Sequence, residues 1–63
     1  ELPWEEEAKR LLDEWVQAQP VLVRISAAKR LREAAERRAR EAGERRVSAA
    51  RVLGETEAAG ALA

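Results

Sequence analysis

The sequence predicts a small all-α domain of three helices, and three observations lead to that prediction. Strong helix formers dominate the 63 residues, which include fourteen alanines and twenty-four charged side chains. Large apolar residues recur at steps of three and four along the chain, which is the helical period. Two prolines and three glycines interrupt this pattern and indicate where helices begin and end. The chain is too short for more than one domain.

The first predicted helix covers about residues 3–17. Pro3 suits the first helical position, and Glu5, Glu6 and Glu7 follow it at the positive end of the helix dipole. Pro20 predicts that the helix ends by about residue 17 or 18. One stripe of this helix carries the apolar residues Trp4, Ala8, Leu11, Leu12, Trp15 and Val16.

The second predicted helix covers about residues 20–42 and runs antiparallel to the first. A strand is the alternative for residues 21–25, since Val and Ile are β-branched, but the chain offers no second strand to pair with it. Gly43 suits a left-handed residue that ends the helix. The predicted apolar stripe consists of Val21, Ile25, Ala28, Leu31, Ala35, Ala39 and Ala42.

A third, shorter helix is predicted over about residues 48–54. Ser48 is a good N-cap residue, and Val47 and Val52 have the spacing of a hydrophobic staple around it. Gly54 is expected to end or weaken this helix.

The domain is therefore predicted to span residues 1–54, followed by a flexible tail over 55–63 that has only Leu62 to bury. Packing between the three helices must supply most of the stability, because exposed ion pairs contribute only about 0.2–1 kcal/mol each. The predicted core consists of Trp4, Leu11, Leu12, Trp15, Ile25, Leu31 and Val52.

The composition excludes several kinds of chemistry. The chain has neither Cys nor His, so it cannot supply thiolate ligands to an iron–sulfur cluster or carry out His-based acid–base catalysis. No Gly-rich string has the spacing of a phosphate-binding loop. No apolar run approaches the length of a membrane span. We therefore expect no catalytic, cofactor-binding or metal site within these residues, and a cytoplasmic chain.

Basic side chains are concentrated in the second predicted helix and the loop after it. Zero net charge, interleaved glutamates and the lack of an aromatic residue in that helix argue against nucleic-acid binding. A solvated helix face is the simplest interpretation, and contact with a protein partner or ligand is the alternative. The candidate contact residues are Arg24, Lys29, Arg30, Arg37 and Arg38.

The order of certain residues resembles a known family. They are Leu2-Pro3-Trp4, Ala8, Leu11-Leu12, Pro20-Val21-Leu22-Val23-Arg24, Lys29-Arg30, Glu36, Ala39-Arg40, Gly43 and Val47-Ser48. This series is similar to the small C-terminal domain of the nitrogenase-like reductases of chlorophyll synthesis, over about residues 2–53. The string from Pro20 to Arg32 resembles the Z subunit of chlorophyllide a reductase most. The B subunit of protochlorophyllide reductase is the alternative, and a free-standing helical interaction module is a further one.

The resemblance implies a parent enzyme in which an ATP-dependent iron–sulfur protein passes electrons to a complex that holds a second iron–sulfur cluster and the tetrapyrrole. It implies other reductase subunits as partners, with the tetrapyrrole nearby. By the same resemblance, this chain is an accessory domain that helps to organise the tetrapyrrole site or the subunit contacts and is not itself catalytic.

Overall fold

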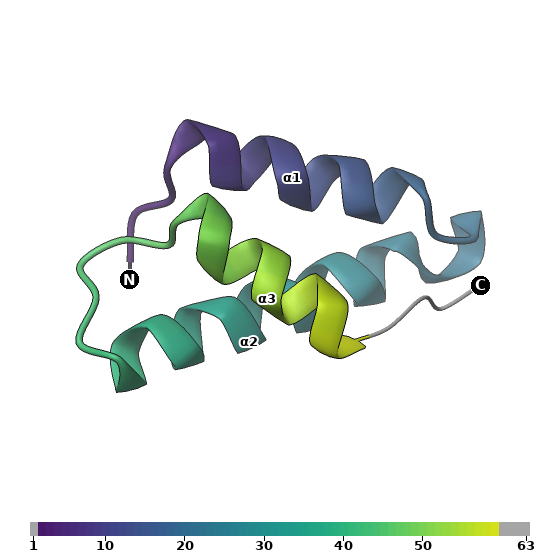
Figure 1. Cartoon of the computed structure of the whole chain (residues 1–63). Coiled ribbons are helices and arrows are strands. Elements are labelled where there is room, and N and C mark those ends of the chain that lie inside the picture. The colour runs from purple at the N-terminus through teal and green to yellow at the C-terminus, as the bar shows by residue number, and fades with distance from the viewer. Residues whose placement is uncertain (1, 60–63) are drawn as a thin grey trace.

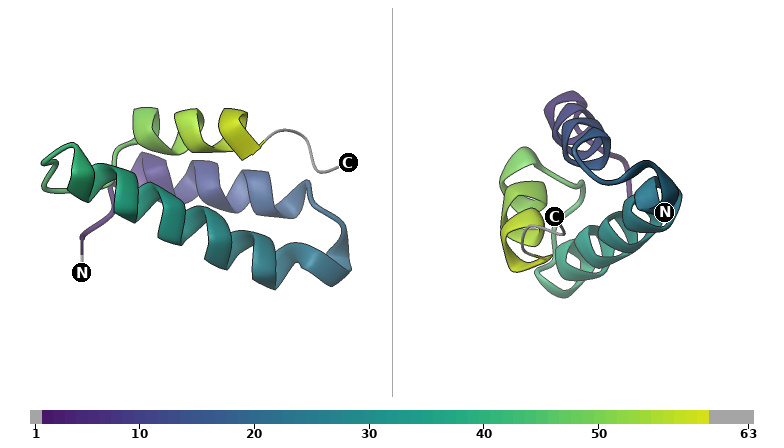
Figure 2. Two further views of the ribbon diagram at one scale, coloured as in Figure 1. Left: turned by 90° about the horizontal axis from the view of Figure 1, so that it is seen from below. Right: turned by 90° about the vertical axis from the view of Figure 1, so that its right-hand side faces the viewer.

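The computed structural model describes residues 2–59, which form three α-helices and one short 3-10 turn. The elements are α1 (Glu6–Gln17), η1 (Val21–Val23), α2 (Arg24–Glu41) and α3 (Ala49–Ala59). α1 and α2 run antiparallel, and α3 packs against both of them (Figures 1 and 2). The predicted all-α, three-helix fold is confirmed. Within the described range, no helix is long and apolar enough to cross a membrane.

The turn between α1 and α2 is held by a network of hydrogen bonds. α1 ends at Gln17, as Pro20 predicted, and the Arg24 guanidinium donates to the backbone carbonyls of Gln17 (3.0 Å, from Nη2) and Gln19 (3.1 Å, from Nε). The buried Gln19 side chain donates from Nε2 to the Trp15 carbonyl at 3.0 Å. Its Oε1 has no hydrogen-bond donor among the described residues. Arg24 therefore supplies donors to carbonyls that the end of α1 leaves unpaired.

The start of the chain differs from the prediction, because α1 begins at Glu6 and not at Pro3. The backbone of Glu5 is extended, and Trp4 forms a parallel β-bridge with Val47. The Glu5 N–H donates to the Val47 carbonyl at 3.0 Å, and the Val47 N–H donates to the Pro3 carbonyl at 2.9 Å. This N-terminal bridge joins the residues that enter α1 to those that enter α3. Trp4 and Val47 are more than forty residues apart in the sequence, so local periodicity could not reveal this bridge.

The end of α2 has the geometry that Gly43 predicted. Gly43 has a φ of 74°, in the left-handed region that glycine adopts without strain. Its N–H donates to the Arg40 carbonyl at 3.0 Å, and the Glu44 N–H donates to the Ala39 carbonyl at 2.8 Å. These two bonds form a Schellman motif, which satisfies carbonyls at the end of α2.

The third helix starts as predicted and is longer than predicted. The Ser48 Oγ accepts a hydrogen bond from the Arg51 N–H at 3.2 Å, which is the expected N-cap bond. The helix then continues through Gly54 to Ala59, because the adjacent Glu55 is buried against α2 and tertiary contact outweighs the low helix propensity of glycine. The rest of the predicted tail, residues 60–63 with Leu62, lies outside the described residues.

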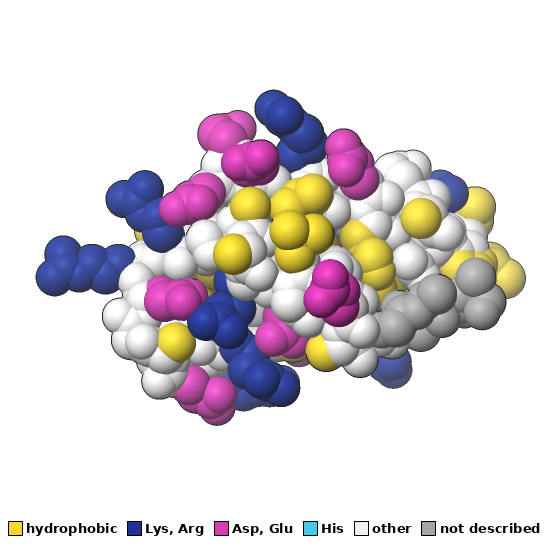
Figure 3. Space-filling view, in the orientation of Figure 1, with side chains coloured by type: hydrophobic (Ala, Val, Ile, Leu, Met, Phe, Trp, Pro, Cys, Tyr) yellow, Lys and Arg dark blue, Asp and Glu magenta, His cyan; other side chains and the backbone are white. Residues whose placement is uncertain are grey.

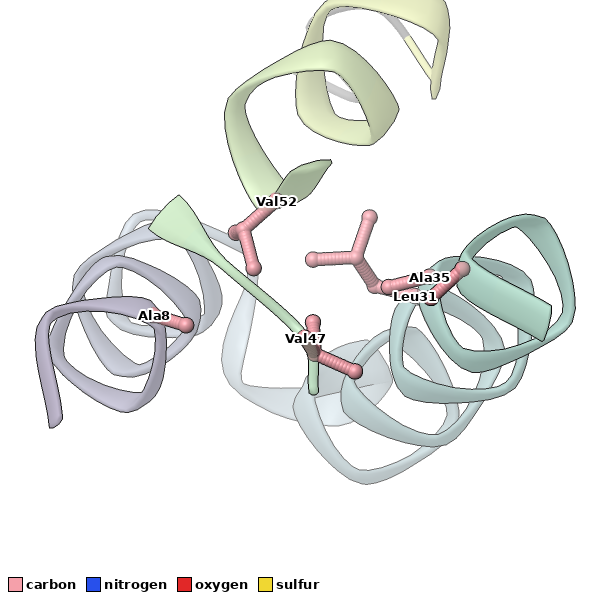
Figure 4. Packing of buried hydrophobic residues seen from close by; sticks show 6 residues of the cluster. Ala8, Leu31, Ala35, Val47 and Val52 are labelled. Carbon is pink, nitrogen blue, oxygen red and sulfur yellow. The ribbon is translucent and has the colours of Figure 1, made fainter. Parts of the chain in front are cut away.

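The core is small and rich in alanine. Its buried members come from all three helices and the loop before α3, and they point toward one another (Figure 4). They are Ala8, Leu31, Ala35, Ala39, Val47 and Val52. Other predicted core residues, namely Trp4, Leu11, Leu12 and Trp15, are half-buried and pack against the margin of this cluster.

The prediction that Ile25 belongs to the core is wrong, because its side chain is 88% exposed. The buried stripe of α2 runs through Ala27, Leu31, Ala35 and Ala39, in steps of four. Residues two apart lie about 200° apart around a helix, so Ile25 points away from the face that buries Ala27. Val21 and Ala42, at the two ends of the predicted stripe, are exposed as well.

Candidate functional site

A hydrogen bond between Trp4 and Glu36 ties the entry to α1 to the middle of α2. The indole Nε1 of Trp4 donates to Glu36 Oε2 at 2.9 Å. The other carboxylate oxygen, Oε1, lies 3.9 Å from Arg40 Nη2, and the Glu36 side chain is only 15% exposed. A carboxylate this sheltered needs such partners, and its role here is to hold two elements together.

A second polar contact closes the loop between α2 and α3. Arg51 donates to Glu44 through two nitrogens, from Nη2 to Oε2 at 2.8 Å and from Nε to Oε1 at 3.3 Å. The hydrogen bond from Arg51 lowers the pKa of Glu44 below its ordinary value of 4.5, and the same bond raises the pKa of Arg51. Arg51 stands where a capping box would have Glu, and it binds a loop carboxylate instead.

A mainly apolar groove of about 620 Å³ lies between the end of α1, the first half of α2 and the end of α3. The Trp15 side chain contributes to one wall, and Arg30 and Glu55 are the charged residues that line it. The Glu55 side chain is 11% exposed, and its Oε2 lies 3.7 Å from Arg38 Nε. The apolar residues that line the groove are Trp15, Pro20, Val23, Ala27, Leu31, Ala34, Ala58 and Ala59. Such a groove can accept an apolar side chain or the edge of a planar ring.

The five basic residues predicted as contacts do not form one continuous face. Arg24 is occupied by backbone carbonyls at the end of α1, and Arg38 is paired with Glu55 of α3. Lys29, Arg30 and Arg37 are exposed, and none of these three makes an ion pair within residues 2–59. Arg30 alone of the five lines the groove.

The sequence interpretation missed an exposed apolar cluster at the junction of α1 and α2. Leu22 is 97% exposed, Ile25 88%, Val21 71% and Val23 38%. We call these four residues the junction patch; hydrophobic side chains are visible at the end of the molecule where α1 meets α2 (Figure 3). A signal was present: four large apolar residues in five positions go all the way round a helix, so a one-sided core could not bury them all.

Together these features define a small helical module with hydrogen bonds and ion pairs between its elements, a mainly apolar groove and an exposed apolar end. A family model described as "Proto-chlorophyllide reductase 57 kD subunit" matches residues 4–53. This match covers well over half of the chain, which therefore belongs to that family. It confirms the family expected from the order of residues. No solved structure matches the chain.

Several of the residues that carry the family resemblance have structural roles in this fold. Trp4 and Glu36 bond to each other, Arg24 caps α1, Gly43 ends α2, and Ser48 caps α3. All of them lie within the matched range. These five residues therefore take part in the contacts that build the three-helix fold.

Proposed function

We propose that this chain is an accessory domain of a nitrogenase-like reductase subunit that acts on a chlorophyll precursor, and that it organises subunit contacts or the tetrapyrrole site without performing the chemistry. The observation that carries the proposal is the structural use of several of the matched residues. Side chains such as Trp4, Arg24 and Glu36, which could bind a ligand, are engaged in contacts within the fold.

The residues of this chain do not fit the iron–sulfur cluster that the parent enzyme is expected to use. Such clusters are held mainly by cysteine thiolates, and the chain contains no cysteine. It also lacks a phosphate-binding loop for ATP. We therefore assign the cluster and the nucleotide to other parts of the parent enzyme, and derive no electron-transfer step through this domain.

Within the family, we propose chlorophyllide a as the substrate of the parent enzyme, which would make this domain part of a Z-type subunit of bacteriochlorophyll synthesis in the cytoplasm. The support is the string from Pro20 to Arg32, whose order of residues resembles that subunit. Protochlorophyllide reduction by a B-type subunit is the second candidate. The family match is compatible with both.

The proposal is tested in the natural subunit that contains this chain, assembled with its partner proteins. Deleting residues 2–59 should reduce ATP-dependent reduction of chlorophyllide a in the dark by about tenfold or more, or prevent assembly of the complex. The cluster content should remain unchanged. Product formation is measured by pigment absorbance, assembly by size-exclusion chromatography, and cluster content by iron analysis. A full-length subunit with the exposed Glu7→Gln change is the control.

Unchanged assembly and turnover after the deletion would overturn the accessory role. A loss of iron in proportion to activity would instead show that the domain helps to hold the cluster. Assaying both pigments with the complete enzyme decides the substrate, since reduction of protochlorophyllide but not chlorophyllide a would overturn the Z-type assignment.

A further inference from the structure

The junction patch has the features of a preformed docking surface. Leu22 and Ile25 are almost fully exposed, whereas the core of the same domain is built largely from alanine and valine. A chain with only thirteen Leu, Val and Ile residues thus places four of them at one exposed end. Exposed apolar clusters of this kind typically mark interaction sites.

The backbone that carries the patch is held rigidly. The Val23 N–H donates to the Pro20 carbonyl at 3.0 Å, and the Ser26 Oγ donates to the Val23 carbonyl at 3.1 Å. Arg24, in the middle of the patch sequence, is bonded to two carbonyls at the end of α1. The apolar side chains are therefore presented on an ordered turn, and binding would cost little further backbone entropy.

The chain segment that carries the patch is basic, and the nearby acidic side chains come from other helices, Asp13 of α1 beside Arg32 and Glu55 of α3 across the groove. Residues 21–32 contain four basic side chains and no acidic one. Within α2, Ile25, Lys29 and Arg32 are separated by steps of four and three, so they share one helix face. Lys29, Arg30 and Arg32 make no ion pair within the described residues, whereas Arg38 and Arg40 farther along α2 are paired with Glu55 and Glu36.

This combination indicates the chemistry of the partner. A second copy of the chain is disfavoured, since an isologous contact through this end would bring two sets of four basic residues together. A partner with an apolar stripe flanked by carboxylates would cover Leu22 and Ile25 and also neutralise Lys29 and Arg32. The groove adjoins the patch, because Pro20 and Val23 line it, and it offers a recess for one apolar side chain of the partner.

We propose that the junction patch docks an amphipathic helix of another subunit of the parent reductase, one whose apolar stripe is flanked by Asp or Glu. The inference rests on the proposed function, since it takes the partner from within that enzyme. The apolar contact would provide most of the affinity, and the basic face would set orientation and rate of association.

Photo-crosslinking in the complete reductase tests the proposal. A benzoylphenylalanine residue is placed at position 22 of the full-length subunit and, as a matched control, at exposed position 10 of α1. The yield of cross-links to another subunit should be at least about tenfold higher from position 22 than from position 10. The cross-linked segment should be an amphipathic helix whose apolar stripe is flanked by Asp or Glu. Equal cross-linking from both positions, or cross-links only to a second copy of the same subunit or to pigment, would overturn the proposal.

Two substitutions give an independent readout. Leu22→Glu should weaken association of the subunits by about tenfold or more, because a well-packed apolar anchor is lost and a repelling charge is added. Lys29→Glu should weaken association less and remove part of its salt dependence. Because both side chains are exposed, the unfolding midpoint of each variant should equal that of the wild type.

The outcomes separate this inference from the proposed function. If deletion of residues 2–59 impairs the enzyme while Leu22→Glu leaves association unchanged, the patch assignment is overturned and the accessory role stands. If the deletion itself has no effect, both are overturned.

Discussion

The two ends of this bundle use the same kinds of residue in opposite ways. At the end with the N-terminal bridge, Val47 and Val52 are completely buried. At the other end, Val21 and Ile25 are 71% and 88% exposed. The difference arises because the N-terminal bridge and the start of α3 cover the side of α2 at the first end. At the second end, Ala58 and Ala59 of α3 line the groove beside the turn but leave the side chains of Val21, Leu22 and Ile25 exposed.

The comparison shows that hydrophobicity alone does not place a residue in the core of so small a domain. A residue is buried where a third element covers it, and the N-terminal bridge provides that cover for Val47. The bridged end is accordingly expected to determine stability, and the junction patch to determine binding. This division of roles gives four predictions, in order of decreasing effect.

The largest expected effect comes from truncating a buried leucine. Leu31→Ala, at a side chain that is 3% exposed, should lower the free energy of unfolding by about 2–5 kcal/mol. The matched control is Leu22→Ala, at 97% exposure, which should change it by no more than about 0.5 kcal/mol. Urea denaturation of the 63-residue chain measures both. Equal effects of the two substitutions would contradict the division between the buried core and the junction patch.

The next effect concerns the bond between Trp4 and Glu36. Trp4→Phe keeps an aromatic ring but removes the donor, which leaves a sheltered carboxylate without its closest partner, and should cost about 1–3 kcal/mol. Trp15→Phe is the control, because no hydrogen bond from its indole occurs within the described residues. Thermal unfolding followed by circular dichroism compares the two. A larger loss from Trp15→Phe would mean that ring volume matters more than the hydrogen bond.

Loss of the α3 cap should have a smaller effect. Ser48→Ala removes the acceptor of the Arg51 N–H and should cost about 1 kcal/mol. Ser26→Ala, at the first turn of α2, removes a hydroxyl that only donates to the Val23 carbonyl at an exposed position, and should cost about half a kcal/mol or less. Helix content and urea midpoints of the two variants are compared, and the prediction fails if they coincide.

The smallest effect is a dependence of stability on pH. The folded state lowers the pKa of Glu44 below 4.5, so its contribution to stability is complete above the ordinary pKa and is lost as the pH falls through the lowered value. Unfolding free energies measured from pH 7 to pH 3 should therefore fall less steeply for Glu44→Gln than for the wild type. Glu33→Gln, at an exposed residue with no ion pair among residues 2–59, should keep the wild-type slope.

Local features of the sequence were sufficient for most of the secondary structure. Pro20 ends α1, Gly43 ends α2 and Ser48 starts α3, because each of these residues restricts or bonds its own backbone and needs no distant partner. The apolar spacing of α1 likewise indicated which of its faces packs inward.

Tertiary contacts decided the rest. The bridge from Trp4 to Val47 keeps Pro3 out of α1, and burial of Glu55 against α2 carries α3 past Gly54. The spacing of apolar residues within one helix also could not show whether Ile25 lies in the core or on an exposed surface.

By itself, then, the sequence determined the number of helices, the helix ends at Pro20, Gly43 and Ser48, and the family, since these depend on residues close together in the chain or on their order. The face of α2 that is buried, and the apolar end that remains open for a partner, depend on where α1 and α3 lie against it. That arrangement is a property of the packed bundle, because burial is set by neighbours in space and not by neighbours along the chain.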